Sequence, residues 1–170
     1  MYLNQVEERA DLKVPVLGLE CNMGPNHPFA YRSNLAYTYD GFENLGHTDN
    51  DASTYTHDNN SGVHENNGLL ASFSDDYRQT GGFFYIADYA ILIDYSLIDG
   101  VVEQVWLSPK HVHGTVSGAY PEGFTRYGNS SQINARPTKR VSRYMKEGVG
   151  KVVGDQERYQ GTLKDLEKRN

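Results

Sequence analysis

A short polar run, NLGHTDNDAS (residues 44–53), carries one imidazole and two carboxylates, on His47, Asp49 and Asp51. His47 and Asp49 are two residues apart, and on an extended chain this spacing projects both side chains to the same side. Such a pair can supply two of the three protein ligands of a metal ion. The alternative is a solvated turn rich in Asn and Asp, and we expect Asp51 to be a turn residue of that kind.

A metal held by His47 and Asp49 needs a third ligand. The chain offers six histidines, at positions 27, 47, 57, 64, 111 and 113. His111 and His113 come late, at the start of the expected strand VHGTVSG. Two histidines and one carboxylate on one face of a metal leave positions open for oxygen and a co-substrate, as in non-haem Fe(II) oxygenases. The order H-x-D, a distant strand and then a single histidine is the order that this chemistry uses on a double-stranded β-helix.

An oxygenase that uses 2-oxoglutarate also needs a partner for the distal carboxylate of that molecule. Arginine suits this task because its fork is permanently charged and binds a carboxylate in a bidentate manner. Arg126 follows His113 by 13 positions and lies on the next expected strand. Neighbouring strands of a roll can bring two such residues to opposite ends of one small ligand. The alternative is a surface arginine.

The elements that must position these residues are mostly short strands. The N-terminal residues 1–11 predict a short amphipathic helix, and the Asn-rich residues 47–68 predict a long loop. Alternation and turn signals predict a mainly β fold, a sandwich or double-sheet roll. The expected strands are 29–41, 69–74, two within 81–96, 100–108, 112–118 and 124–134. Helical patterns follow at 139–147, with Pro137 and Thr138 able to start the helix, and at 155–170.

The charge distribution separates an acidic body from a basic tail. Residues 1–135 contain 17 Asp and Glu against 6 Lys and Arg, whereas residues 136–170 contain 5 against 10. A uniformly basic nucleic-acid binder would look different, so any phosphate contact should come from the tail. The single cysteine, Cys21, excludes an intramolecular disulfide framework and a Cys-based zinc cage. We expect one domain over residues 1–170, with a core at about 30–135 and a tail at 136–170, in an intracellular protein without a membrane span.

Residues 32–134 resemble the fungal TET-like branch of the TET/J-binding-protein family of Fe(II) and 2-oxoglutarate dioxygenases. The resemblance is carried by NLAYTYDGFENLGHTDND, GGFFYIADYAILIDYSLIDGVVEQVWLS, HGTVSG and FTRYGNSSQIN. It implies a double-stranded β-helix, or jelly-roll, core with flanking helices. It also implies Fe(II) held by His47, Asp49 and His113, and a salt bridge from Arg126 to 2-oxoglutarate.

Further co-substrate contacts follow from the same resemblance. Many relatives carry R-x-S at the arginine, but position 128 is glycine here, so we assign the serine role to Ser130 on the same strand face. Asn34 and Tyr37 lie on a strand that related oxygenases use to hydrogen-bond 2-oxoglutarate. Their alternative is that of ordinary strand residues.

The function that the resemblance implies is hydroxylation of a methylated base in DNA, 5-methylcytosine first, with O2 as co-substrate and a nuclear location. A base in a duplex would have to be flipped into the pocket. Two alternatives remain: a small-molecule or protein hydroxylase on the same fold, and a catalytically inactive binding module. In the tail, the cluster Lys139, Arg140, Arg143 and Lys146 predicts a phosphate-binding stripe or, alternatively, a solvated helix face.

Overall fold

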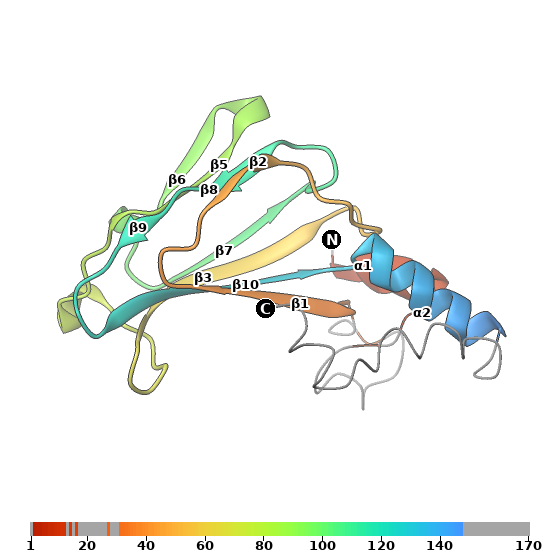
Figure 1. The fold of residues 1–170 in the computed structure, drawn as a ribbon, viewed down its shortest axis with the longest axis horizontal. Helices are drawn as coiled ribbons and strands as arrows, with labels where there is room; N and C mark the ends of the chain where they lie inside the picture. The colour runs from red at the N-terminus through yellow and green to blue at the C-terminus, as the bar shows by residue number, and fades with distance from the viewer. Residues whose placement is uncertain (1, 13, 15, 17–26, 28–30, 148–170) are drawn as a thin grey trace, which may run out of the picture.

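A computed structural model describes residues 2–12, 14, 16, 27 and 31–147, and within these the fold is mainly β (Figure 1). Helix α1 (Tyr2–Asp11) comes first and helix α2 (Ala135–Glu147) last. Between them lie the strands β1 (Asn34–Tyr39), β2 (Asn44–His47), β3 (Thr56–His64), β4 (Thr80–Gly81), β5 (Phe83–Ile86), β6 (Ile91–Asp94), β7 (Val101–Trp106), β8 (His113–Thr115), β9 (Gly118–Ala119) and β10 (Phe124–Gln132). Three 3-10 turns interrupt them: η2 (Phe73–Asp75), η3 (Ala87–Tyr89) and η4 (Tyr95–Leu97).

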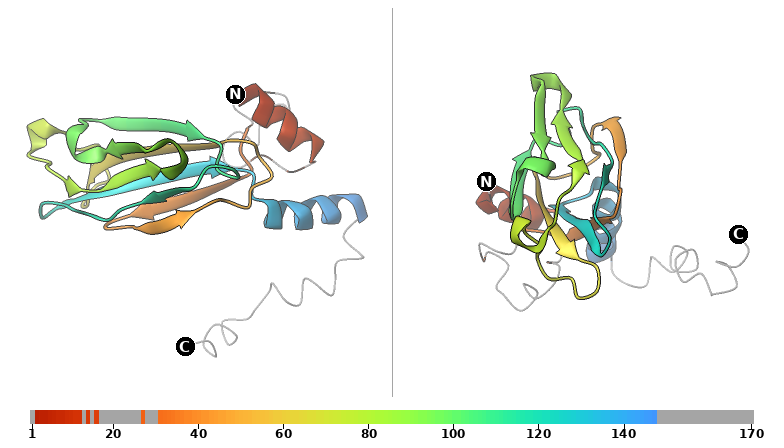
Figure 2. Two further views of the ribbon diagram at one scale, coloured as in Figure 1. Left: turned by 90° about the horizontal axis from the view of Figure 1, so that it is seen from above. Right: turned by 90° about the vertical axis from the view of Figure 1, so that its left-hand side faces the viewer.

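Two four-stranded antiparallel sheets form the body. One has the order β1-β10-β3-β7 and the other the order β2-β8-β5-β6, while β4 and β9 form a small separate pair. The two sheets face each other, and α1 and α2 lie at the same end of them (Figures 1 and 2). Side chains from both sheets line one cavity between them. This arrangement is consistent with the predicted jelly-roll core.

The predicted strands in the second half of the chain are confirmed. Residues 81–96 hold β5 and β6, and β7, β8 and β10 lie within the expected ranges. The aromatic side chains of Phe84, Tyr95 and Trp106 form the hydrophobic core between the sheets, each less than one tenth exposed. Strand β6 differs, because its apolar residues Ile91 and Leu92 are exposed.

The prediction of a loop over residues 47–68 is wrong in its second half, where β3 runs through the middle of a sheet. This strand, THDNNSGVH, pairs with β10 on one side and β7 on the other. Its polar composition suggested a solvated loop, yet Thr56, Asp58 and Asn60 are buried and line the cavity. The strand is polar because it faces a polar cavity, and strand composition reflects the surface on which a strand packs.

The predicted strand at residues 69–74 is also wrong. Only Leu70 forms a bridge, to Val63, and its side chain is exposed. A tight turn with Gly68 at φ +69° folds the chain back, and η2 follows. At the start of η2, Ser72 and Asp75 bond to each other's backbone in a capping box, which favours a helical turn over a strand.

Helix α2 begins earlier than Pro137 and Thr138 predicted. The side-chain oxygen of Asn134 accepts a hydrogen bond from the Arg136 amide at 3.1 Å, so Asn134 caps the helix and Ala135 is its first residue. Pro137 falls in the first turn, where its missing N–H costs no helical hydrogen bond. The helix predicted at 155–170 lies outside the described residues. None of the helices within the described ranges is long and apolar enough to span a membrane.

We expect Gly114→Ala to destabilise the fold, because β8 passes close to its neighbours at this residue. A Cβ atom there would lie 2.5 Å from the Tyr85 hydroxyl and 2.7 Å from the Asn44 carbonyl oxygen. Overpacking of this kind costs about 1–3 kcal/mol, which urea unfolding measures. Gly41→Ala is the matched control, since its nearest atom is the movable Ser117 hydroxyl at 3.0 Å. Equal unfolding midpoints for the two variants would contradict the close approach.

Candidate active site

His47, Asp49 and His113 converge at one end of the cavity. Their ligand atoms all lie within 4.8 Å of one another. Nε2 of His47 is 3.3 Å from Oδ1 of Asp49, and Nε2 of His113 is 3.5 Å from Oδ2 of the same carboxylate. The predicted convergence of the H-x-D pair and the late histidine is thus met in the geometry. Two imidazole nitrogens and one carboxylate oxygen are a donor set that suits Fe(II).

The strand register brings the two histidines together. His47 is the last residue of β2 and lies opposite His113, the first residue of β8. A register shift between Asn44 and His47 marks a bulge, a feature that re-aims side chains near functional sites. Asp49 lies two residues beyond β2, and its amide donates to the carbonyl oxygen of Ser108 at 2.9 Å. The carboxylate is therefore anchored through its backbone to the segment after β7.

Both imidazoles are held through Nδ1. Nδ1 of His47 lies 2.8 Å from the carbonyl oxygen of Leu45, and Nδ1 of His113 lies 2.9 Å from that of His111. A carbonyl oxygen only accepts, so Nδ1 carries the proton in each ring and donates it. The neutral tautomer then presents Nε2 as an electron-pair donor, which is the second-sphere arrangement usual for metal-bound histidine.

The electrostatics of the three groups couple them. Burial alone would raise the pKa of Asp49, but the hydrogen bond from His113 and the positive charges on His113 and His47 hold it below its ordinary value. Burial alone would lower the pKa of His113, but the hydrogen bond to Asp49 raises it above its ordinary value. Each charge stabilises the other, as it would in a site that exchanges protons for a cation.

Asp51 is not the solvated turn residue that we expected. Its Oδ2 accepts from the hydroxyls of Thr56 at 3.2 Å and Ser108 at 3.1 Å, and both of these residues are almost fully buried. Burial and the charge of Asp49 raise the pKa of Asp51 to about 6. Since the carbonyl of Ser108 binds the Asp49 amide, this network braces the loop that carries Asp49.

Arg126 opens into the same cavity as the three groups. The cavity has a volume of about 180 Å³. Arg126 is 4% exposed, and its guanidinium donates weakly to the Phe42 carbonyl at 3.4 Å and lies over the Tyr95 ring at 5.0 Å. Its Nη1 is buried with no hydrogen-bond partner among the described residues. A buried donor without an acceptor is costly, so this nitrogen is suited to an anionic ligand.

The other residues predicted to contact the co-substrate divide into two groups. Ser130 lines the cavity, and its contact with the co-substrate stays a prediction. Asn34 and Tyr37 do not line it: the Asn34 side chain accepts from the Asn134 amide, and Tyr37 is 61% exposed against Tyr127. For Tyr37 the prediction is wrong because of strand alternation, since Ala36 and Thr38 face the cavity and position 37 must point away.

The side chains around Gly128 explain why this position holds glycine and not the serine of many relatives. A Cβ atom there would collide with the Thr38 hydroxyl and lie 2.7 Å from the side-chain oxygen of Asn60. These two side chains fill the space that a residue larger than glycine would need. No serine fits two residues after Arg126 unless Thr38 and Asn60 move.

The polar side chains that β3 contributes to the cavity were not predicted from the sequence. Thr56, Asp58 and Asn60 lie at alternate positions, which is the spacing of one strand face. That period of two was the available signal, but the residues are polar, so hydrophobic alternation did not reveal it. Trp106 also lines the cavity, and its buried indole N–H has no partner among the described residues.

We expect His113→Ala to abolish tight binding of a divalent metal while His111→Ala retains it. The His111 ring contacts Tyr89, and only the backbone oxygen of His111 serves His113. Loss of an outer partner alone weakens metal binding by about 10–100-fold, so loss of a ligand should cost more. Calorimetric titration with Fe(II) under anaerobic conditions measures both variants. Equal affinities would contradict the assignment of His113.

Comparison with known proteins identifies the family. The sequence model described as the Tet-like 2OG-Fe(II) oxygenase superfamily matches residues 3–118, and no curated protein matches the chain. The matched range contains His47, Asp49 and His113 but ends before Arg126, so the case for Arg126 is geometric. The family prediction is confirmed, and the fungal branch stays a prediction. Because the match covers more than half of the chain, the protein belongs to the Tet-like 2OG-Fe(II) oxygenase superfamily and is an Fe(II)- and 2-oxoglutarate-dependent dioxygenase.

Proposed function

We propose that this dioxygenase hydroxylates a methylated base in DNA, with 5-methylcytosine as its first substrate. The observation that carries the proposal is that one cavity contains both a group of three potential metal ligands and a buried arginine with an unused donor. The family supports the reaction class, and the DNA substrate is the further step. A nuclear location belongs to the same proposal.

In this proposal His47, Asp49 and His113 hold Fe(II). The Nδ1 hydrogen bonds to Leu45 and His111 keep both rings turned toward the metal. Three protein ligands leave the remaining positions of the metal open to the co-substrate and O2. Bound Fe(II) with 2-oxoglutarate would supply the oxidising chemistry, in which O2 gives one oxygen atom to the succinate formed from 2-oxoglutarate with release of CO2, and the other to the hydroxylated C–H bond.

Arg126 binds the distal carboxylate of 2-oxoglutarate, and Ser130 lies on the same wall of the cavity. A guanidinium that is already desolvated and stacked over Tyr95 loses little freedom when the carboxylate arrives. The phenyl and indole rings of Phe84 and Trp106 line the cavity beside His113 and limit the access of water. These residues orient the co-substrate between the metal and the arginine.

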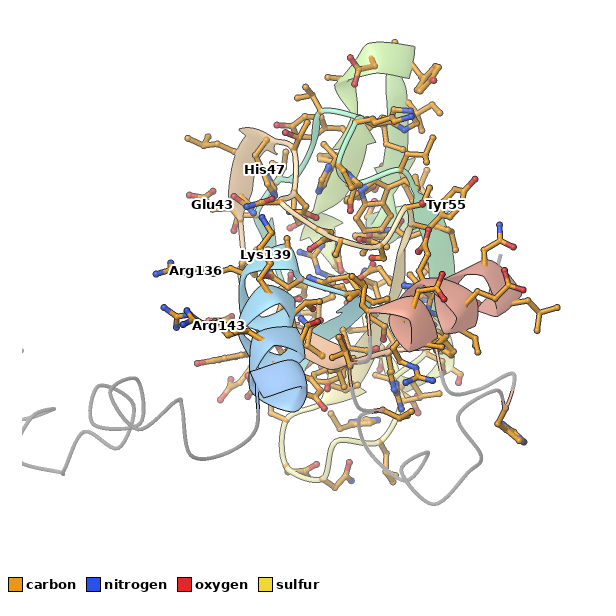
Figure 3. All side chains as sticks on the ribbon, turned by 90° about the vertical axis from the view of Figure 1, so that its right-hand side faces the viewer. Glu43, His47, Tyr55, Arg136, Lys139 and Arg143 are labelled. Atoms are coloured by element: carbon orange, nitrogen blue, oxygen red, sulfur yellow. The ribbon has the colours of Figure 1, made fainter. Side chains whose placement is uncertain are left out.

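The case for DNA rests on charge and position. The body is acidic, and the basic side chains of α2 offer the main source of phosphate contacts. Lys139 and Arg143 line a groove between α2 and the loop at Ala52, which directly follows Asp51. In Figure 3, the labelled side chains of Arg136, Lys139 and Arg143 lie on the same side of the view as His47. A strand held along α2 would therefore lie against Ala52, in the loop that carries Asp49.

The test of the function is succinate release from 2-oxoglutarate with Fe(II) and O2. The protein should release more succinate with an oligonucleotide that contains 5-methylcytosine than with the unmethylated oligonucleotide, and the methylated base should gain one oxygen. Stimulation by a free amino acid instead would indicate a small-molecule hydroxylase. Absence of iron-dependent succinate under all of these conditions would indicate a binding module without turnover.

We expect Arg126→Lys to raise the KM for 2-oxoglutarate by about 10–100-fold, because lysine keeps the charge and loses the bidentate fork. The magnitude is that of one charge-assisted hydrogen bond. Arg78→Lys is the matched control, since Arg78 stacks on Phe73 and bonds to backbone oxygens outside the cavity. An unchanged KM in the Arg126 variant would refute its role.

The basic residues of α2 give a separate prediction. If they contact phosphates, log K for DNA should fall with log salt at a slope of about −0.9 for each phosphate neutralised. Combined replacement of Lys139, Arg143 and Lys146 by glutamine should flatten this slope by about two to three units. Arg78→Gln serves as the control. If affinity and slope stay unchanged in the triple variant, α2 does not bind DNA.

A further inference from the structure

Asp58 occupies the stretch of β3 that joins the two ends of the cavity. At the metal end, the Thr56 hydroxyl lies 2.6 Å from that of Ser108, which bonds to Asp51. At the other end, Gly62 lies opposite Arg126 in the register of β3 and β10. Asp58 and Asn60 are the residues between them on the same strand face, and both line the cavity. A molecule that reaches from the metal to Arg126 passes over them.

One oxygen of the Asp58 carboxyl group is already committed. Its Oδ2 accepts from the side-chain amides of Gln104, at 2.8 Å, and Asn60. In the part of the chain that the structure describes, neither oxygen pairs with a cation within 4 Å, and Oδ1 has no hydrogen-bond partner. Asp58 is 9% exposed, so an ionised carboxylate here is deprived of water and left without a close counter-charge.

This environment disfavours the charged form. Burial raises the pKa of Asp58 to about 7, although the hydrogen bond from Gln104, the charge of Arg126 and the hydrogen bond from Asn60 each act in the opposite direction. The neutral acid is therefore well populated at neutral pH. A neutral carboxyl group can donate a hydrogen bond, whereas an ionised one can only accept.

An incoming 2-oxoglutarate brings two carboxylates into this cavity. An ionised Asp58 would repel these carboxylates and would partly neutralise the positive charge of Arg126 that attracts them. A protonated Asp58 would instead donate a hydrogen bond to one of them. We propose that Asp58 is a co-substrate contact that binds 2-oxoglutarate as the neutral acid, so that binding takes up one proton. This inference rests on the proposed role of Arg126.

The neighbouring groups do not supply the same proton. From η4, burial raises the pKa of Tyr95 above its ordinary value, so its hydroxyl stays protonated. From β10, Arg126 contributes a guanidinium, which does not give up its proton in proteins. Glu103 and His57 pair with each other. Each is one position along its strand from Gln104 or Asp58, so their side chains point to the face of the sheet opposite to that of Asp58. The pKa of Asp51 is raised to about 6, and this residue lies at the other end of the cavity, beside the three candidate metal ligands. A variant of Asp58 itself therefore assigns the proton.

The experiment is anaerobic calorimetry of 2-oxoglutarate binding to the Fe(II)-loaded chain, from about pH 6 to about pH 8.5. Repeating it in buffers of different ionisation enthalpy counts the protons taken up. For the wild type, we expect the Kd to rise about tenfold per pH unit above the titration of Asp58, with close to one proton bound at the upper end. Asp58→Asn keeps the size of the group, and its Kd should be nearly independent of pH and lower than that of the wild type above neutrality.

Glu103→Gln is the matched control, because it removes a carboxylate from the opposite face of the same sheet, and it should behave as the wild type. The inference is overturned if Asp58→Asn keeps the wild-type slope and proton uptake. Wild-type binding without proton uptake near pH 8 overturns it as well, even if Asp58→Asn fails to fold. The two proposals fail separately. Unchanged 2-oxoglutarate affinity in Arg126→Lys removes the proposed role of Arg126. Weakened affinity in Arg126→Lys, together with a wild-type pH slope in Asp58→Asn, removes only this inference.

Discussion

The antiparallel pairing of β2 with β8 is the interaction on which the candidate active site depends. It sets His47 opposite His113, although 66 positions separate them in the chain. The Asp49 amide then bonds to the Ser108 carbonyl, and the hydroxyls of Thr56 and Ser108 on Asp51 brace the same loop, so the carboxylate is held beside both rings. A slip of one residue would turn one histidine to the other face of its strand. The convergence of the three candidate ligands therefore depends on the register of β2 and β8.

The second constraint is that the space between the two sheets must contain an apolar core and also a polar wall for the cavity. Phe84, Tyr95 and Trp106 pack there as a core, whereas Thr56, Asp58 and Asn60 of β3 line the cavity beside them. Buried polar groups cost stability unless they find partners. Some of these polar groups bond to each other, as Gln104 does to Asp58. By contrast, Nη1 of Arg126 is a buried donor without a hydrogen-bond partner among the described residues. The unused donor of Arg126 lies where the co-substrate is expected to bind, which is where a fold tolerates such a cost.

Local patterns in the sequence predicted the parts of this site that local spacing determines. The H-x-D spacing pointed to His47 and Asp49 as two possible metal ligands and left His111 and His113 open as the third. The family resemblance, and not the spacing, implied His113 and the role of Arg126. The role of Asp51 was out of reach, because its partner Ser108 lies 57 residues away. Tyr37 was misplaced because the phase of β1 is set by its pairing with β10, where Thr38 lies opposite Gly128. Strand β3 was missed because its buried face is polar.

The central claim is that one cavity holds Fe(II) through the three ligands and 2-oxoglutarate between that metal and Arg126. Equilibrium dialysis of 2-oxoglutarate under anaerobic conditions, with and without Fe(II), tests it most directly. A shared site predicts one 2-oxoglutarate bound per chain, with tight binding only when the metal is present, because the metal and the arginine each hold one end. Equal affinity with and without Fe(II) would contradict the claim, since the co-substrate would then bind away from the metal.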